Sequence, residues 1–412
     1  MATDLFTPVL NEHTRSVRFF NGRLLSGEAM TDEQKGLRVA RELLAQAVGD
    51  GIARGFEVKV AVGTSTVQAP ALTVGAGVAI NRRGEILLLE NDTEVRLIRP
   101  VNPAQAPDKI FQTCVPPQQG VYIADAGVYL LTVCSIGAAN GLAPVTGLGG
   151  LQASCNAKYI VDAVQFRLLE LPVDKTLLPN PRLRNLVAYQ CFGVDGLDDF
   201  ATDPLGPTPP PSTLLDKIRG TRLTDCDVPL AVMYWTATGG VQFVDLWSVR
   251  RRVTETRAAS PFVLDDARLA TAEAMVLQFQ EQIRAIFATA ARPELVIGTE
   301  LFRYLPPVGI LPYRSDPTRR GFGVSFFQGL TIRDLYYFEG TKVGYLIDAC
   351  LRHGPIDLGT REMITVYQIR ENMQSLAQGV AVQPAIVFCN GHAPFVSDAR
   401  YDLAHFNYAN FA

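Results

Sequence analysis

The chain has 412 residues, of which 48% are hydrophobic and 19% charged, so we expect two or three domains that each bury a core. Its formal net charge is −3, and without a basic excess to neutralise phosphates we expect no nucleic-acid partner. The start, MATDLFTPVLNEH, lacks the cationic and apolar blocks of a signal peptide, and no run of about 18 apolar residues occurs. We therefore expect the protein to be synthesised and assembled in the cytoplasm, without insertion into a membrane. If it leaves the cell, we expect it to do so as part of an extracellular particle.

Seven cysteines are scattered along the chain, and no two of them form a Cys-x-x-Cys pair. An odd and widely spaced set differs from a disulfide framework or a zinc ribbon. We expect most of these thiols to be reduced and buried.

A capped helix is predicted over residues 31–48. Thr31 and Gln34 fit a capping box, in which the side chains of the first and fourth residues bond the free amides of the first turn. Gly49 and Gly51 are expected to end the helix. One apolar face follows at helical spacing, and its members are Leu37, Ala40, Leu44, Ala47 and Val48.

Strand-like patterns dominate from Gly55 to Leu246. Two segments rich in proline, 100–120 and 203–211, predict surface excursions, and 135–150, rich in glycine and alanine, predicts a loop. Asn81–Gly84 has turn chemistry and predicts a hairpin. The predicted strands are 56–60, 72–74, 77–80, 85–89, 93–98, 128–134, 161–171, 229–234 and 241–246.

A long helix is predicted over 261–290, followed by mixed elements. Its seam repeats in steps of three and four and comprises Leu269, Ala272, Val276, Phe279, Ile283 and Ile286. Such a seam packs either on its own domain or on another subunit, and both alternatives stay open here. Apolar 304–312, a helix over 341–353 and strands over 363–369 and 385–389 follow.

These elements predict an α+β fold with an N-terminal helix, a β-rich, sandwich-like domain, a long helix and a mixed α/β C-terminal domain. The expected division is a docking segment over 1–55, a β-rich domain over 56–257 with its proline-rich excursion at 203–211, and a third unit over 258–412.

Recognisable catalytic patterns are missing. None of the four histidines has metal-ligand spacing to another ligand, and no nucleophile elbow, HExxH or phosphate loop occurs. Cys389 and His392 are near neighbours, and Asp198-Asp199 and Asp265-Asp266 are adjacent acids, but adjacency alone makes neither a catalytic pair nor a glycosidase. We expect a protein that is no enzyme and has no cofactor and no metal.

Arginine clusters and C-terminal aromatics suggest interfaces. The planar guanidinium suits contacts between subunits, and Arg250 and Arg251 are our candidates within the triplet 250–252. Aromatic residues gather at Phe326-Phe327, 336–338, Tyr345 and 406–411. Core packing is the leading interpretation of these aromatics, and a sugar-binding groove is the alternative.

Several segments, in order, resemble proteins encoded beside phage-like contractile tails and contractile injection systems. They are Phe19–Leu25 with the helix behind it, the exit at 51–58, the hairpin at 72–86, the strands near 128–131 and 163–169, the stretch 228–232 with Asp245 and 250–252, and 304–309 with 354–358. The loop after Leu131 departs from the acidic, proline-rich character of such relatives.

The resemblance implies a non-catalytic structural component of a contractile, phage-tail-like particle, at the baseplate periphery, in a tail fibre or at the tail end. Its partners would be other particle subunits, with a homo-oligomer expected. The docking candidates are Phe19, Phe20, Gly22 and Arg23. A fibre-like module that binds a receptor or cell-surface glycan is the alternative, and an envelope-degrading hydrolase is a third.

Overall fold

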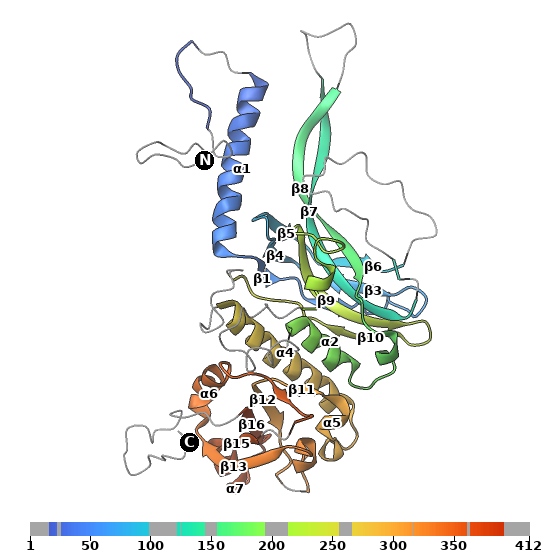
Figure 1. Ribbon diagram of the computed structural model, residues 1–412, viewed down its shortest axis with the longest axis vertical. Coiled ribbons are helices and arrows are strands. Elements are labelled where there is room, and N and C mark those ends of the chain that lie inside the picture. Colours follow the sequence, from blue (N-terminus) through green and yellow to red (C-terminus); the bar gives the residue numbers. More distant parts are fainter. Residues whose placement is uncertain are drawn as a thin grey trace, which may run out of the picture.

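A computed structural model describes residues 16–22, 26–98, 122–123, 125–144, 155–193, 213–254, 266–315, 317–360 and 363–390. The fold is α+β, with an N-terminal helix, a group of sheets, a long helix and a second, mixed sheet, in the order expected (Figure 1). The two proline-rich segments lie outside the described residues.

Two three-stranded antiparallel sheets begin the β-rich part. One has the order β1-β4-β5, formed by β1 (Gly51–Gly55), β4 (Gly77–Ile80) and β5 (Ile86–Leu89). The other has the order β2-β3-β6, formed by β2 (Val58–Val60), β3 (Ala71–Val74) and β6 (Thr93–Arg96). The predicted hairpin at 81–84 is confirmed, because β4 pairs with β5 from Gly77↔Leu89 to Ile80↔Ile86.

A four-stranded antiparallel sheet, β10-β9-β7-β8, packs on these sheets. Its strands are β7 (Gly127–Pro144), β8 (Cys155–Glu170), β9 (Asp227–Thr236) and β10 (Gly240–Asp245). The loop predicted at 135–150 is wrong for 135–144, which continue β7. Backbone pairing with β8 from Ser135↔Val164 to Pro144↔Cys155 overrides the weak strand propensity of glycine and alanine.

The apolar run in β7 is buried on both sides of this sheet. Tyr129, Leu131 and Val133 join a core with the two small sheets, so the packing is sandwich-like as predicted. Val128 and Leu130 face the opposite side and pack on helix α2 (Leu183–Phe192). This alternation explains why the run is continuously hydrophobic.

A buried ion pair also stabilises the four-stranded sheet. Arg167 of β8 bonds Asp227 of β9, and both side chains are at most 3% exposed. Asp227 further accepts hydrogen bonds from the Thr132 hydroxyl at 3.0 Å and the Thr224 amide at 2.9 Å. With these partners the desolvated carboxylate is compensated.

The C-terminal sheet has the order β12-β16-β15-β13 and is mixed. β12 (Val308–Pro312), β16 (Ala385–Asn390) and β15 (Met363–Ile369) are antiparallel, whereas β13 (Thr331–Phe338) runs parallel to β15. Helix α4 (Asp266–Thr289) covers one face and α6 (Val343–Cys350) the other. A short pair, β11 (Tyr304–Leu305) and β14 (Ile356–Asp357), and the helices α5 (Gly298–Leu301) and α7 (Arg370–Ala377) complete this part.

The seam of the long helix packs within its own chain. Phe279 and Ile283 belong to the core of the mixed sheet, and Phe279 lies 5.4 Å from the rings of both Phe302 and Phe388, measured between centroids. On its other side, Ala274 and Met275 pack against α2. Of the two alternatives for this seam, the described contacts favour packing on its own chain.

The carboxylate of Asp245, 1% exposed, joins the β-rich part to the long helix. It accepts hydrogen bonds from Arg184 of α2 at 2.7 Å, from Gln278 of α4 at 2.9 Å and from the amide of Ser248 at 3.0 Å. Arg184 also bonds Glu281 of α4 at 3.0 Å. Burial opposes the charge on Arg184, but the attraction and hydrogen bonds of Asp245 and Glu281 together outweigh it and raise the pKa of the guanidinium.

Helix α1 (Gly27–Val48) begins four residues earlier than predicted, because the N-cap is Ser26, whose hydroxyl accepts from the Ala29 amide at 3.2 Å. The capping box at Thr31 is therefore wrong, and that hydroxyl bonds the Gly27 carbonyl inside the helix. The predicted end is confirmed, since Gly49 at φ +111° caps the helix. The domain boundaries at 55/56 and 257/258 stay predictions.

Replacing Asp245 with alanine should destabilise the chain by about 3 kcal/mol, because Arg184 would keep its buried charge with only Glu281 left to offset it. Urea unfolding followed by tryptophan fluorescence measures the loss. Asp348→Ala, at an exposed aspartate of α6, is the control and should change stability by less than about 0.5 kcal/mol. Equal effects of the two substitutions would contradict the role given to Asp245.

Candidate functional site

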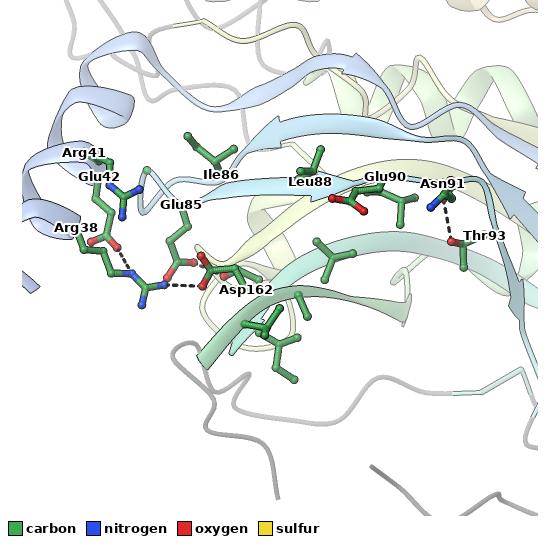
Figure 2. A pocket seen from close by; sticks show the side chains of 17 residues that line it. Arg38, Arg41, Glu42, Glu85, Ile86, Leu88, Glu90, Asn91, Thr93 and Asp162 are labelled. Carbon is green, nitrogen blue, oxygen red and sulfur yellow. Dashed lines mark hydrogen bonds and ion pairs between the residues drawn. The ribbon is translucent and has the colours of Figure 1, made fainter. Parts of the chain in front are cut away.

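The candidate site is a groove of about 590 Å³ between helix α1, strand β5 and the two long strands β7 and β8 (Figure 2). In Figure 1, α1 and the ends of β7 and β8 project from the same side of the β-rich part. We call residues 135–144 and 155–164 of these strands the hairpin arm. The groove lies between α1 and the base of this arm.

The floor of the groove is apolar and its rim is charged. Ile86 is 61% and Leu88 51% exposed on β5, and Val161 of the arm is 42% exposed. Between them, Glu85 receives hydrogen bonds from Ser135 of β7 and, at 2.7 Å, from the Asn81 side chain. Exposed aliphatic groups beside fixed charges are typical of protein contact surfaces.

Arg38 bridges the two walls. Its guanidinium lies 3.2 Å from Glu42 on α1 and 3.5 Å from Asp162 on the arm, as the dashed lines in Figure 2 mark. Arg41 points to the same groove but has no hydrogen bond or ion pair among the described residues. Exposed pairs of this kind contribute about 0–1 kcal/mol, so the two walls are only weakly fastened.

Helix α1 has almost no core contact. Of its 22 residues only Ala45 is buried, although helices in proteins normally owe their stability to a packed apolar face. The apolar face predicted from the sequence lies in solvent, with Leu37 60%, Leu44 70% and Val48 60% exposed. We call its heptad-spaced residues the outer seam: Met30, Leu37, Ala40, Leu44 and Ala47.

Beyond its base, where Ile136 is buried and Val164 packs on the core, the described side chains of the hairpin arm are exposed. Strand β9 pairs with β7 only up to Cys134, so the arm is a two-stranded ribbon. Three consecutive apolar residues, Tyr159 at 56%, Ile160 at 65% and Val161 at 42% exposure, place apolar groups on both of its faces. An isolated ribbon of two strands is marginally stable in water.

The predicted docking residues lie before α1. Phe19 is 54% and Phe20 62% exposed, and the Glu33 carboxylate accepts a hydrogen bond from the Val17 amide at 2.7 Å, which holds this segment beside the helix. Gly22 has φ +89°, and a Cβ atom there would meet open space. Arg23 lies outside the described residues.

Arg250 and Arg251, our other interface candidates, are committed to intrachain bonds. Arg250 donates to the carbonyls of Gly55 and Phe56, the latter at 3.0 Å, and is 8% exposed. Arg251 donates to the carbonyls of Trp247 and Ser248, and burial lowers its pKa to about 10. Both guanidinium groups are therefore occupied by hydrogen bonds within the chain. Their role between subunits stays a prediction.

Half of the described C-terminal aromatics are core residues. Phe326, Phe327 and Phe338 are between 1% and 6% exposed, whereas Tyr337 and Tyr345 are exposed. The cluster 406–411 lies outside the described residues. The core interpretation is therefore confirmed for the buried members, and the glycan groove stays a prediction for the exposed ones.

Most described cysteines are buried and form no disulfide, namely Cys134, Cys191, Cys350 and Cys389. The expectation of reduced thiols is wrong for Cys226, which is disulfide-bonded. Cys350 of α6 and Cys389 of β16 share one apolar cluster, where their mutual hydrogen bond and burial raise the pKa of Cys350. Thiols in such a setting are inert packing groups.

The residues that line the groove include neither histidine nor cysteine. Within the described part of the chain, no three His, Cys, Asp or Glu side chains are grouped as a metal site would require. No described helix is long and apolar enough to cross a bilayer. No family model matches the chain, and no curated protein is significantly similar to it.

Gly84→Ala should disturb the groove specifically. Gly84 has φ +79°, and a Cβ atom there would lie 2.0 Å from the carbonyl oxygen of Glu42, so α1 would have to shift. Gly63→Ala is the matched control, because Gly63 has φ +81° and no neighbour within 4 Å. We expect G84A to be less stable than G63A by about 1–3 kcal/mol, and to be cut faster in α1 by a protease. Equal behaviour of the two variants would contradict this packing of α1 on the turn.

Proposed function

We propose that the protein is a non-catalytic structural subunit that docks onto other subunits of a larger particle through its N-terminal face. This docking face comprises Phe19, Phe20, helix α1 and the hairpin arm. A contractile, phage-tail-like particle is the setting that the resemblance of 19–58 and the later segments suggests, with the baseplate periphery, a tail fibre or the tail end as the place.

The observation that carries the proposal is the exposure of two long elements on one side of the molecule. Helix α1 buries one residue of 22, and the arm displays apolar groups on both faces. Burying a Leu or Phe side chain contributes about 1.5–3 kcal/mol. A partner that covers the exposed apolar side chains of α1 and the arm would therefore gain this free energy for each of them. Large apolar patches on soluble proteins mark interaction sites.

The construction of the rest of the chain supports this function. Among the described residues, α2, α4, β7 and β9 contribute buried side chains to apolar cores, whereas α1 buries Ala45 alone. The groove between α1 and the arm offers an apolar floor and charges of both signs, which suit a protein partner better than a polyanion.

Replacing Phe19 and Phe20 with alanine should leave a folded protein that joins the particle at least about tenfold less efficiently, because two exposed aromatic anchors are lost from the interface. Pull-down of the expressed particle, followed by quantification of the subunit, measures the loss.

The control is Val62→Ala, at a side chain that is 98% exposed in a loop away from the docking face. It should assemble as well as the unchanged protein. Normal incorporation of the double phenylalanine variant would refute the docking assignment. The absence of sheath and tube proteins among the products of neighbouring genes would instead refute the contractile setting.

A further inference from the structure

Strand β8 is the outer strand of the four-stranded sheet, and its part in the hairpin arm projects beyond the other strands of that sheet except β7 (Figure 1). At the base of β8, the Arg222 guanidinium covers the outer edge by donating to the Glu170 carbonyl at 3.0 Å. Among the described residues, no segment other than β7 bonds the backbone of 156–164. The arm therefore offers a row of unpaired amide and carbonyl groups, which is a template for a further strand.

The hydrogen-bond phase of β8 shows which residues turn to this edge. The Leu171 amide donates to the Val128 carbonyl at 2.9 Å, and pairing with β7 then continues without a bulge. In an antiparallel pair such residues alternate, so the odd-numbered residues of β8 bond β7. The even-numbered ones direct their N–H and C=O groups outward, as the bond from Arg222 to Glu170 illustrates.

We propose that a second copy of this chain pairs with this edge, β8 against β8 in the antiparallel direction, about a two-fold axis at Ile160. The inference rests on the proposed function, since it names the partner of one part of the docking face. Two arms paired in this way form one four-stranded sheet, which is more stable than a ribbon of two strands. A two-fold contact uses the same surface on both copies, so the edge must be complementary to itself.

The side chains around Ile160 have this complementarity. With the axis at Ile160, that residue lies opposite its own copy, and Tyr159 lies opposite Val161 on the other face of the sheet. These three residues are 65%, 56% and 42% exposed, respectively, in the single chain. Lys158 lies opposite Asp162. Aromatic with β-branched side chains, and opposite charges, are the cross-strand pairs that stabilise antiparallel strands.

The neighbouring registers lose this match. The smallest slip that keeps every side chain on its face is two residues, and it would place Ile160 opposite either Lys158 or Asp162. A slip of four residues would bring two copies of Lys158, or two copies of Asp162, directly opposite each other, and like charges in that position are destabilising. The sequence of the edge therefore selects the register centred on Ile160.

Both charged side chains are available to a second copy. Lys158 has no ion pair among the described residues, and its ammonium lies 5.0 Å from the ring centroid of the adjacent Tyr159. The Asp162 side chain is 82% exposed, and its Oδ1 atom lies 3.5 Å from Arg38. A carboxylate has two acceptor oxygens, so Asp162 can bind Lys158 of another copy without releasing Arg38.

Charge reversal tests the association. Because so narrow an interface is weak, we expect the full-length protein to be dimeric at about 100 μM in sedimentation equilibrium. Lys158→Asp and Asp162→Lys should each weaken the dimer at least about tenfold, since each sets like charges opposite each other. An equimolar mixture of the two variants should dimerise again, because every such pair then has opposite charges. Lys175→Asp, at an exposed lysine outside the arm, is the control and should dimerise normally.

Two results would overturn the pairing of β8 with β8. One is a monomer at every concentration, and the other is a dimer that neither charge reversal weakens.

Cysteine substitution tests the register. Ile160→Cys should form a homodisulfide on mild oxidation of the full-length protein, because the two Cα atoms at the axis would be about 5.5 Å apart. Tyr159→Cys is the control, since that residue would lie diagonally from its own copy at about 7–8 Å, too far for a disulfide. Mass spectrometry of the tryptic peptide 159–167, which has no natural cysteine, identifies the product. Equal crosslinking of the two variants would overturn the register.

These outcomes are distinguishable from those of the proposed function. If the protein is monomeric at every concentration while the double phenylalanine variant fails to join the particle, the docking function stands and the pairing of β8 fails. If the dimer forms and responds to charge reversal while the double phenylalanine variant joins the particle normally, the docking function fails and the pairing stands.

Discussion

The buried carboxylate of Asp245 fixes how the two halves of this protein sit on each other. It bonds one residue from each of the two helices between the sheets, Arg184 of α2 and Gln278 of α4. Asn185 adds a second link from α2, since its side chain accepts from the amides of Arg303 and Tyr304 at 2.7 and 3.0 Å. Buried polar groups need complete sets of partners, so these bonds specify one arrangement where apolar packing alone would allow several.

Hydrogen bonds from a buried side chain also hold the turn between β1 and β2, which follows α1 in the chain. Phe56 has φ +58°, which is rare for a residue other than glycine, and it is fully buried. Arg250 compensates this strain by bonding the carbonyls of both Gly55 and Phe56. Gly77 must lack a side chain there, because its Cβ would lie 2.5 Å from the Phe56 nitrogen. These contacts hold the turn between β1 and β2, which follows α1, in one conformation.

A rigid base with two unpacked projections suits a protein whose work is to bind other subunits. A flexible surface must be ordered when it binds, and this entropic cost lowers the affinity. A preorganised surface avoids most of this cost.

Sequence patterns predicted most elements, because periodicity and turn chemistry are local properties. The hairpin at 81–84, the doubly buried run of β7, helix α4 and strands β15 and β16 all follow from spacing. The start of α1 was misplaced because Ser26 and Thr31 are equally good caps locally, and only the folded chain decides which hydroxyl meets a free amide. Helix α2, strand β13 and the second half of β7 were missed, since their formation depends on neighbours distant in the sequence.

The two long helices, α1 and α4, show what the sequence determines and what only the tertiary structure decides. Both sequences dictate an amphipathic helix. The spacing of the apolar residues cannot distinguish a helix face that packs on its own chain from one that packs on another molecule, because both need the same side chains. Only the tertiary structure shows that the seam of α4 is covered by phenylalanines of its own chain, while the seam of α1 lies in solvent.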